Sequence, residues 1–448
     1  MKDKKRRFET FTFYDHTGIE THLKHMAEQG WLLEKVGPFF WTYRRIEPKA
    51  LTFSVCYFPQ ASQFDPEPPE GQRTFYDFCE HTGWTLAAAS AQMQVFYNEQ
   101  ENPVPIETDP MLEMDAIHQS AKKGYLFSQF LLLGVALMNG GMLAYQLKNN
   151  PILVLSNALS LFSMLCWPIL ILLTAGDIAA YYLWRSRARK AAEQGEFLDT
   201  KSYPGVQKAL LFVVVAGFAW GLSYMGGALA ANAVLSVICT FVSIFVVCGV
   251  REWLKRKKVP AGTNRVVTFT LCIVLPLLVV VLGTVALLRT GAGGWDSSRN
   301  DNLPLTVADL VEDPADGKLD QDVRLAQSPL LAVLNVWQYL WLGRNAGDPA
   351  PRCLNYTAIQ VKAEALYALC RDDLLGKEND GVPEGWKGYY EPVDPAPWGA
   401  AEAYRHFYQN TGAQNEYLLC YPGRIVEIDF DWEPTPEQMA VVGERLGG

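Results

Sequence analysis

The sequence contains, at residues 266–288, the stretch VVTFTLCIVLPLLVVVLGTVALL, which carries no Asp, Glu, Lys or Arg. Crossing the hydrocarbon core of a bilayer, which is about 30 Å thick, takes roughly 20 apolar residues in a helix. A helix on the surface of a soluble protein would carry polar residues on one face, whereas this stretch is apolar on every side. The stretch therefore predicts a membrane-spanning helix.

Four other windows share this length and lack of charge. Together the five predicted spans are Tyr125–Leu147, Ile152–Thr174, Ala209–Ala230, Ala233–Val250 and Val266–Leu288. We therefore expect an integral membrane protein in three parts. Residues 1–110 form a soluble α+β module, residues 111–290 an all-α transmembrane bundle of about five helices, and residues 303–448 a second soluble α+β domain.

The positions of the basic residues predict which ends of the spans face the cytoplasm, because short loops rich in Lys and Arg stay on that side. Such residues lie before the first span, between the second and third, and between the fourth and fifth: Lys122, Lys123, Arg185, Arg187, Arg189, Lys190, Lys201, Lys208, Arg251, Lys255, Arg256, Lys257, Lys258 and Arg265. We expect a protein of the cell membrane with a cytoplasmic N-terminus and an extracytoplasmic C-terminal domain. A re-entrant hairpin formed by spans three and four would instead leave that domain in the cytoplasm.

The N-terminal module contains an internal repeat. Its predicted elements are a strand at Phe8–Tyr14, a helix at Thr17–Gln29, strands at Trp31–Val36 and Phe39–Arg45, and then a strand at Leu51–Phe58, a helix at Arg73–Thr82, and strands at Trp84–Ala89 and Gln92–Tyr97. Gly30-Trp31 corresponds to Gly83-Trp84, and Trp41-Thr-Tyr43 to Val95-Phe-Tyr97. Two βαββ units, ferredoxin-like in style, predict one pseudo-symmetric sheet with its helices on one face.

Two segments of this module resemble a known family. The segments are LKHMAEQGWLLEKV at residues 23–36, followed by FFWTY at 39–43, and FYDFCEHTGW at 75–84. They are similar to the bacterial membrane-protein family catalogued as domain of unknown function 2812, over about residues 8–100. The resemblance implies a module that precedes several membrane helices, with no established activity, often encoded beside small PadR-like transcriptional regulators. The ending Val95-Phe-Tyr97 departs from the family, where a Trp or a more basic strand is commoner.

Few residues of the module are candidates for chemistry. His22 and His25 stand at i, i+3 on a helix and could share a metal with Glu20 or Glu28, but no fourth ligand is specified and a solvated helix face is the favoured explanation. A set of aromatic residues could line a ligand pocket or form the core of the repeats: Trp31, Phe40, Trp41, Tyr43, Phe53, Tyr57 and Trp84. No cofactor is expected.

The predicted spans contain one packing motif and no charge. Gly217-Phe-Ala-Trp-Gly221 is a GxxxG pattern, which lets two helix backbones approach closely. Asp177 follows the second span by three residues, so we expect it at the cytoplasmic surface of the membrane, with a polar path through the bundle as the alternative.

The C-terminal domain carries 13 Lys and Arg against 25 Asp and Glu from residue 289 onward, a charge near −12. Its predicted elements are strands at Leu330–Trp341 and Leu354–Val361, helices at Lys362–Leu375 and Ala400–Asn410, a hairpin of Glu416–Tyr421 with Arg424–Trp432, and a last helix after Thr435-Pro436-Glu437-Gln438, which has the pattern of a capping box. Cys353, Cys370 and Cys420 permit at most one disulfide within this domain.

The composition limits the possible functions. A net charge of −9 without an extended basic face argues against direct nucleic-acid binding. No Ser-His-Asp order, HExxH or Gly-x-Ser-x-Gly pattern occurs, so no catalytic residue is predicted. The leading hypothesis is a membrane-anchored sensory or regulatory protein whose cytoplasmic module meets a protein partner. The alternatives are a transporter subunit or permease and, third, a metal-dependent enzyme.

Overall fold

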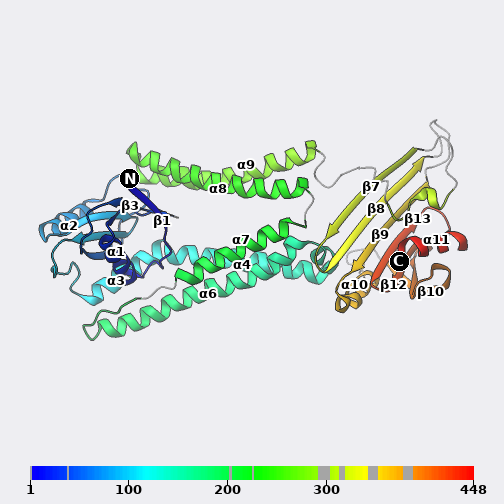
Figure 1. Cartoon of the computed structure of the whole chain (residues 1–448), viewed down its shortest axis with the longest axis horizontal. Helices are drawn as coiled ribbons and strands as arrows, with labels where there is room; N and C mark the ends of the chain where they lie inside the picture. Colours follow the sequence, from blue (N-terminus) through cyan, green and yellow to red (C-terminus); the bar gives the residue numbers. More distant parts are fainter. Residues whose placement is uncertain are drawn as a thin grey trace. The chain divides into compact units, whose positions relative to one another are not determined.

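The computed structural model describes residues 3–37, 40–200, 204–224, 227–290, 303–311, 318–341, 352–376 and 387–448 (Figure 1). The chain divides into two compact units. The first unit comprises residues 1–140, 166–217 and 237–279, and the second comprises residues 141–165, 218–236 and 280–448.

The first unit begins with one order of elements that occurs twice. The elements are β1 (Lys4–Phe8), α1 (His16–Glu28), β2 (Trp31–Lys35), β3 (Phe40–Arg45), β4 (Thr52–Tyr57), α2 (Glu70–His81), β5 (Thr85–Ser90) and β6 (Met93–Asn98). The predicted βαββ repeat is thus found. Gly30 and Gly83 end the two helices with φ angles of 81° and 86°, the left-handed conformation that glycine adopts without strain.

The prediction of a single sheet is wrong. Each repeat forms its own three-stranded antiparallel sheet, in the order β1-β3-β2 and β4-β6-β5, with its last strand at the centre. The edge strands β2 and β5 lie close to each other without pairing. Each also carries a bulge at the equivalent place, between Leu33 and Lys35 and between Leu86 and Ala88. A bulge locally disrupts the ladder and increases the twist, which favours two separate sheets over one continuous sheet.

The bulges also correct the alignment of the repeats. Leu33 pairs with Tyr43, and Leu86 pairs with Phe96, so Tyr43 corresponds to Phe96 and not to Tyr97. The predicted correspondence of the last strands is therefore wrong by one residue. The two sheets nevertheless share one core with α1, which buries Leu23, Tyr43 and Val95 completely.

The predicted strand at residues 8–14 is also wrong, because β1 ends at Phe8 and the segment that follows is irregular. The alternation of aromatic residues there has another cause. Phe11 packs on Trp41 with ring centroids 5.5 Å apart, and Phe13 packs on Tyr57 at 5.1 Å. These side chains are held by tertiary contacts and need no strand partner.

A polar helix, α3 (Pro110–Lys123), follows the module. After it come the apolar helices, which are α4 (Tyr125–Asn149), α5 (Pro151–Leu155), α6 (Ala158–Ala192), α7 (Pro204–Leu222), α8 (Gly227–Arg256) and α9 (Ala261–Thr290). Among the described residues, four segments are long and apolar enough to cross a membrane: Tyr125–Asn149, Ala158–Ala192, Ala233–Arg256 and Ala261–Val285. This architecture is compatible with a multi-pass membrane protein.

The predicted third span, Ala209–Ala230, is only partly matched. Helix α7 ends at Leu222 and α8 already begins at Gly227, so the break lies several residues before the one predicted at 231–232. Phe212–Leu222 forms an apolar helix shorter than the four long ones.

The second unit contains a seven-stranded antiparallel sheet in the order β10-β11-β12-β13-β9-β8-β7. Its strands are β7 (Lys318–Gln327), β8 (Leu331–Trp341), β9 (Arg352–Val361), β10 (Gly388–Val393), β11 (Glu402–Tyr408), β12 (Gly412–Tyr421) and β13 (Arg424–Phe430), and its helices are α10 (Tyr367–Leu375) and α11 (Pro436–Leu446). The predicted helix at Ala400–Asn410 is wrong. The segment is β11, which pairs with β10 on one side and β12 on the other, so tertiary pairing overrides a weak helical pattern.

Both faces of this sheet are covered. One face buries Val426, Ile428 and Phe430 in a core that also contains Val442 and Leu446 of α11. The other face buries Ile425 and Leu418 with α10 and with Leu155 of α5. The domain therefore has two cores, and the second includes residues from the helical region of its own unit.

The predicted last helix and its capping box are confirmed. Thr435 caps α11, and its backbone N–H donates to Gln438 Oε1 at 2.9 Å in a complete capping box. All nine cysteines are free, and Cys370 and Cys420 pack in the same core.

Gly443 should be essential for the stability of this domain. A Cβ added to Gly443 would come within 2.9 Å of the carbonyl carbon of Trp398 and still closer to its oxygen. Although alanine gains about 1 kcal/mol over glycine in helix propensity, overpacking against backbone costs roughly 1–3 kcal/mol. We expect Gly443→Ala to lower hydrogen-exchange protection of residues 395–448 in the full-length protein. Glu444→Ala, on the exposed side of α11, is the control, and equal protection in both variants would refute the close packing.

Candidate functional site

The N-terminal module meets the helices of its own unit through a cluster of aromatic residues. Tyr14 stacks on Trp184 of α6 with centroids 4.9 Å apart, and contacts Tyr181 edge-on at 5.3 Å. Phe13 stacks on Tyr125 at the start of α4, at 6.0 Å. The irregular segment after β1 therefore forms the contact between the module and the helices. We call this region the junction.

Hydrogen bonds between buried groups fix the junction. His118 Nδ1 of α3 and the Tyr181 hydroxyl lie 2.7 Å apart. The Thr17 hydroxyl, at the start of α1, accepts the backbone N–H of Thr200 at 2.7 Å. Burial, with Arg185 and Lys122 nearby, lowers the pKa of His118, which favours the neutral imidazole. An unpaired polar group here would cost roughly 1–3 kcal/mol, so these bonds specify one docking geometry.

The helices α8 and α9 also contact the module. Asn264, fully buried, donates from Nδ2 to the carbonyl oxygens of Phe64 and Arg251, each at 3.3 Å. Lys258 forms an ion pair with Glu67 at 2.6 Å. The contact with the module therefore involves the end of α8 and the start of α9 as well as α4 and α6.

Beside the junction lie several acidic side chains that are poorly hydrated. Burial raises the pKa of Glu20, on α1, to about 7, although Glu20 Oε1 accepts the N–H of Val55 at 2.8 Å. Burial raises the pKa of Glu107 to about 7 as well, and the charge of Glu113 adds to the shift of both. Glu113 Oε1 lies 3.4 Å from His16 Nε2. The carboxyl groups of Glu20 and Glu107 can therefore titrate near neutral pH.

The stability of the module should therefore fall as pH rises. The folded-state pKa values of Glu20 and Glu107 lie above the ordinary value of 4.5, so the folded state holds protons that the unfolded chain releases between about pH 4.5 and 7. We expect the full-length protein in detergent to unfold at a lower temperature at pH 8 than at pH 5. Because Gln is neutral and still accepts a hydrogen bond, Glu20→Gln with Glu107→Gln should remove roughly 1–3 kcal/mol of this dependence.

The exposed Glu47→Gln variant is the control for this measurement. An unchanged difference in unfolding temperature between pH 5 and pH 8 in the double variant would rule out Glu20 and Glu107 as its source.

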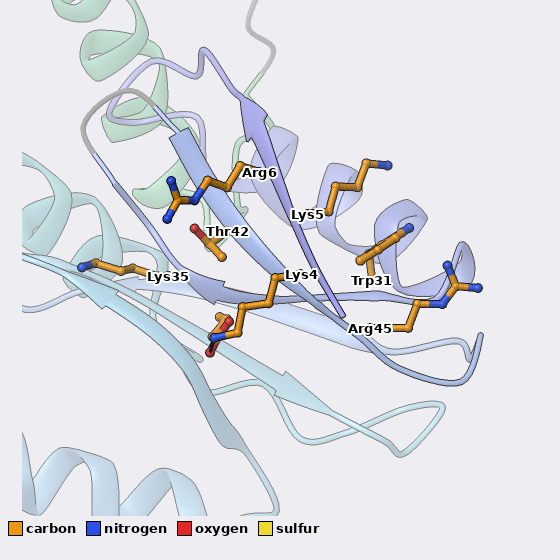
Figure 2. Close-up of a pocket in the computed structure, with 8 residues that line it drawn as sticks. Lys4, Lys5, Arg6, Trp31, Lys35, Thr42 and Arg45 are labelled. Atoms are coloured by element: carbon orange, nitrogen blue, oxygen red, sulfur yellow. Dashed lines mark hydrogen bonds and ion pairs between the residues drawn. The ribbon is translucent and has the colours of Figure 1, made fainter. Parts of the chain in front are cut away.

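A basic groove of about 990 Å³ lies on the sheet β1-β3-β2 (Figure 2). It is lined by Lys4, Lys5, Arg6, Trp31, Glu34, Lys35, Thr42 and Arg45. The Lys5 ammonium and the Arg45 guanidinium each lie 5.2 Å from the centre of the Trp31 ring, at cation–π distance. Lys4 is paired with Glu34 at 2.6 Å. The groove includes the edge strand β1, whose outer side has no strand partner among the described residues.

The histidines proposed as metal ligands have separate partners. His22 Nε2 lies 3.1 Å from Glu9 and 3.3 Å from the Tyr43 hydroxyl, while His25 lies beside Glu28 at the surface. Burial lowers the pKa of His22. Within the described residues, no group of three or more His, Cys, Asp or Glu side chains is arranged to hold a metal ion.

The aromatic candidates divide between core and cavities. Tyr43 is fully buried, and the buried Trp84 donates its indole N–H to the carbonyl oxygen of Val104 at 2.9 Å. Trp31 lines the basic groove and Trp41 lines a second cavity at the junction. Phe40 is exposed, whereas Phe53 and Tyr57 belong to the shared core.

The two glycines of the GxxxG pattern lie in α7. A Cβ on Gly221 would come within 2.5 Å of Leu159 Cδ2 in α6, so the helices approach closely there.

Several residues at or beside the junction had no signal in the sequence. Glu107, Glu113, His118 and Tyr181 reach this region only through the fold, and each alone is typical of a helix or loop surface. The sequence indicated Glu20 only as a possible metal partner of the histidines. A partial signal was available at Tyr14, because Tyr14-Asp15 ends an aromatic run directly before a helix. Such a run indicates a buried segment as readily as a strand.

In each unit a folded part packs on apolar helices. This arrangement is compatible with the class of multi-pass membrane proteins that carry folded domains outside the membrane. Residues 15–129 match the family model described as "Protein of unknown function (DUF2812)", and this region of the chain belongs to that family. The match extends beyond residue 100 through α3 into α4, so it includes Thr17, His118 and Tyr125 of the junction. No curated protein and no solved structure matches the chain.

Proposed function

We propose that the chain is a membrane-anchored sensory or regulatory protein of the cell membrane. The observation that carries the proposal is the docking of each soluble part on helices of its own unit. In the first unit His118 and Thr17 form the hydrogen bonds described above. In the second unit the buried Ser328 hydroxyl donates to the carbonyl oxygen of Leu155 at 2.6 Å. Domains held in this way follow the helices to which they are bound, as signalling across a membrane requires.

In this proposal the N-terminal module lies in the cytoplasm and the C-terminal domain outside the cell, with α7 as the fifth crossing. The support is the distribution of Lys and Arg around the helix ends, which favours a cytoplasmic location for the ends near the module.

Labelling of introduced cysteines in intact cells tests this sidedness. Cys79 and Cys370 are fully buried and unsuitable as reporters, whereas Glu47 and Glu444 are exposed. We expect a membrane-impermeant maleimide to label Glu444→Cys in intact cells and Glu47→Cys only after permeabilisation. The opposite pattern would invert the topology, and labelling of both or neither would contradict an odd number of crossings.

The partner that we propose for the module is a protein with an acidic surface, bound at the basic groove. Arg6 and Lys35 are exposed there and bring positive charge beside Trp31, and charge complementarity guides such encounters. By resemblance to the family, a PadR-like regulator is the partner to test first.

Transcript levels of the genes that flank this gene test both parts of the proposal. We expect deletion of residues 1–110 to change them, and the double variant Arg6→Glu/Lys35→Glu to have the same effect because it reverses the charge of the groove. Lys24→Glu, an exposed charge reversal on α1, is the control. Unchanged transcripts in the deletion strain would contradict the regulatory function. A response to the deletion without one to the double variant would contradict only the groove.

A further inference from the structure

The second cavity of the first unit lies at the junction and has a volume of about 300 Å³. We call it the junction cavity. The lining residues that decide its chemistry are Phe11, Phe13, Trp41, Tyr125, Gln129 and Asp177. Its volume is at the lower end of the roughly 300–1,000 Å³ of small-molecule sites, so the cavity is suited to a small ligand.

The aromatic walls of this cavity are held in place by neighbouring groups. Phe11 packs on Trp41 at 5.5 Å, and Phe13 lies between Tyr57 and Tyr125. The Tyr57 hydroxyl also donates to the carbonyl oxygen of Phe13. Four aromatic side chains from the module and α4 thus form a rigid lining before any ligand enters.

Asp177 of α6 is the only Asp, Glu, His, Lys or Arg among the residues that line the cavity. It is half-buried, and within the described chain it has neither an ion pair nor a hydrogen-bond partner. The Tyr125 hydroxyl, also on the lining, is buried without a partner. A carboxylate removed from much of its water requires a compensating positive charge.

From these observations we propose that the junction cavity binds an organic ammonium cation. The faces of aromatic rings carry negative potential and attract an ammonium group, and the Asp177 carboxylate has the opposite charge to that group. Anionic ligands are excluded because both the carboxylate and the ring faces repel them. A divalent metal ion would need about six oxygen ligands, whereas the charged or amide oxygens on the lining come only from Asp177 and Gln129.

A ligand in this cavity would contact the module and the helices at once, because Phe11, Phe13 and Trp41 belong to the module while Tyr125 and Asp177 belong to α4 and α6. This inference goes beyond the proposed function, since it concerns binding by the protein alone and requires no partner. Under the proposed function, such a ligand would be a signal that changes the docking of the module.

Calorimetric titration of the purified full-length protein in detergent tests the site with two cationic probes and one neutral control compound. Choline and benzyltrimethylammonium carry the quaternary ammonium group, and 3,3-dimethylbutan-1-ol has the shape of choline without its charge. We expect at least one cation to bind with a Kd of about 1 mM or below and the neutral alcohol to bind at least tenfold more weakly. Asp177→Asn, which keeps the size of the side chain, should weaken cation binding at least tenfold, and Phe13→Leu should weaken it as well.

The exposed Asp115→Asn variant of α3 carries the same chemical change outside the cavity, and its affinity should equal that of the unaltered protein. Failure of both cations to bind, equal binding of the neutral alcohol, or full affinity in Asp177→Asn would each overturn the proposal. These outcomes leave the transcript measurements unaffected, so the binding site and the regulatory function stand or fall separately.

Discussion

The apolar surface of the four long helices is the constraint on which the rest of the structure depends. In the 18-residue windows that define them, between 0 and 11% of the residues are buried inside the protein, and side chains such as Phe130, Leu172, Phe245 and Val280 are exposed. So much apolar surface is unstable in water but stable in hydrocarbon. In that surrounding every backbone polar group must be satisfied internally, and a helix achieves this within its own segment. A hydrocarbon surrounding therefore favours long apolar helices in this region.

The soluble parts solve a different problem, which is how a domain in water can hold one orientation on a helix. Apolar packing alone is non-directional and would allow the module to shift. At the junction, the pair of His118 and Tyr181 and the pair of Thr17 and Thr200 add directional bonds to the aromatic contacts. In the second unit, Ser328 does the same with Leu155. Burial makes each of these bonds expensive to break, and this favours one arrangement over its neighbours.

The elements that were predictable from the sequence are those governed by short-range rules. Glycine ends α1 and α2 because only the local backbone matters at Gly30 and Gly83, and the capping box of Thr435 and Gln438 lies within four residues. A membrane span is likewise predictable from the absence of charge over roughly 20 consecutive residues, because this is a property of the local sequence alone. The errors occur where distant residues decide. Residues 9–14 alternate like a strand but pack on Trp41, Tyr57 and Trp184, and β11 follows its two neighbouring strands.

The candidate site follows the same division. The basic character of β1 and the position of Asp177 near the end of an apolar stretch are visible in the sequence. The sequence does not show that Asp177 lines a cavity with Phe11 and Trp41, because more than 130 residues separate Asp177 from both. The strand predicted for residues 8–14 would also have directed Phe11 elsewhere.

The junction therefore combines two kinds of group that respond to conditions outside the protein. Glu20 and Glu107 are buried enough to titrate near pH 7, and Asp177 lines an aromatic cavity that has no basic side chain among its lining residues. A fold selected only for stability would avoid both, because each costs free energy that an apolar residue would not. Under the proposed function, a proton or a cation bound beside the junction would change the contacts that dock the module. A sensor would have a use for this structural cost, because the groups that carry it lie next to contacts between the module and its helices, whereas a passive anchor would have none.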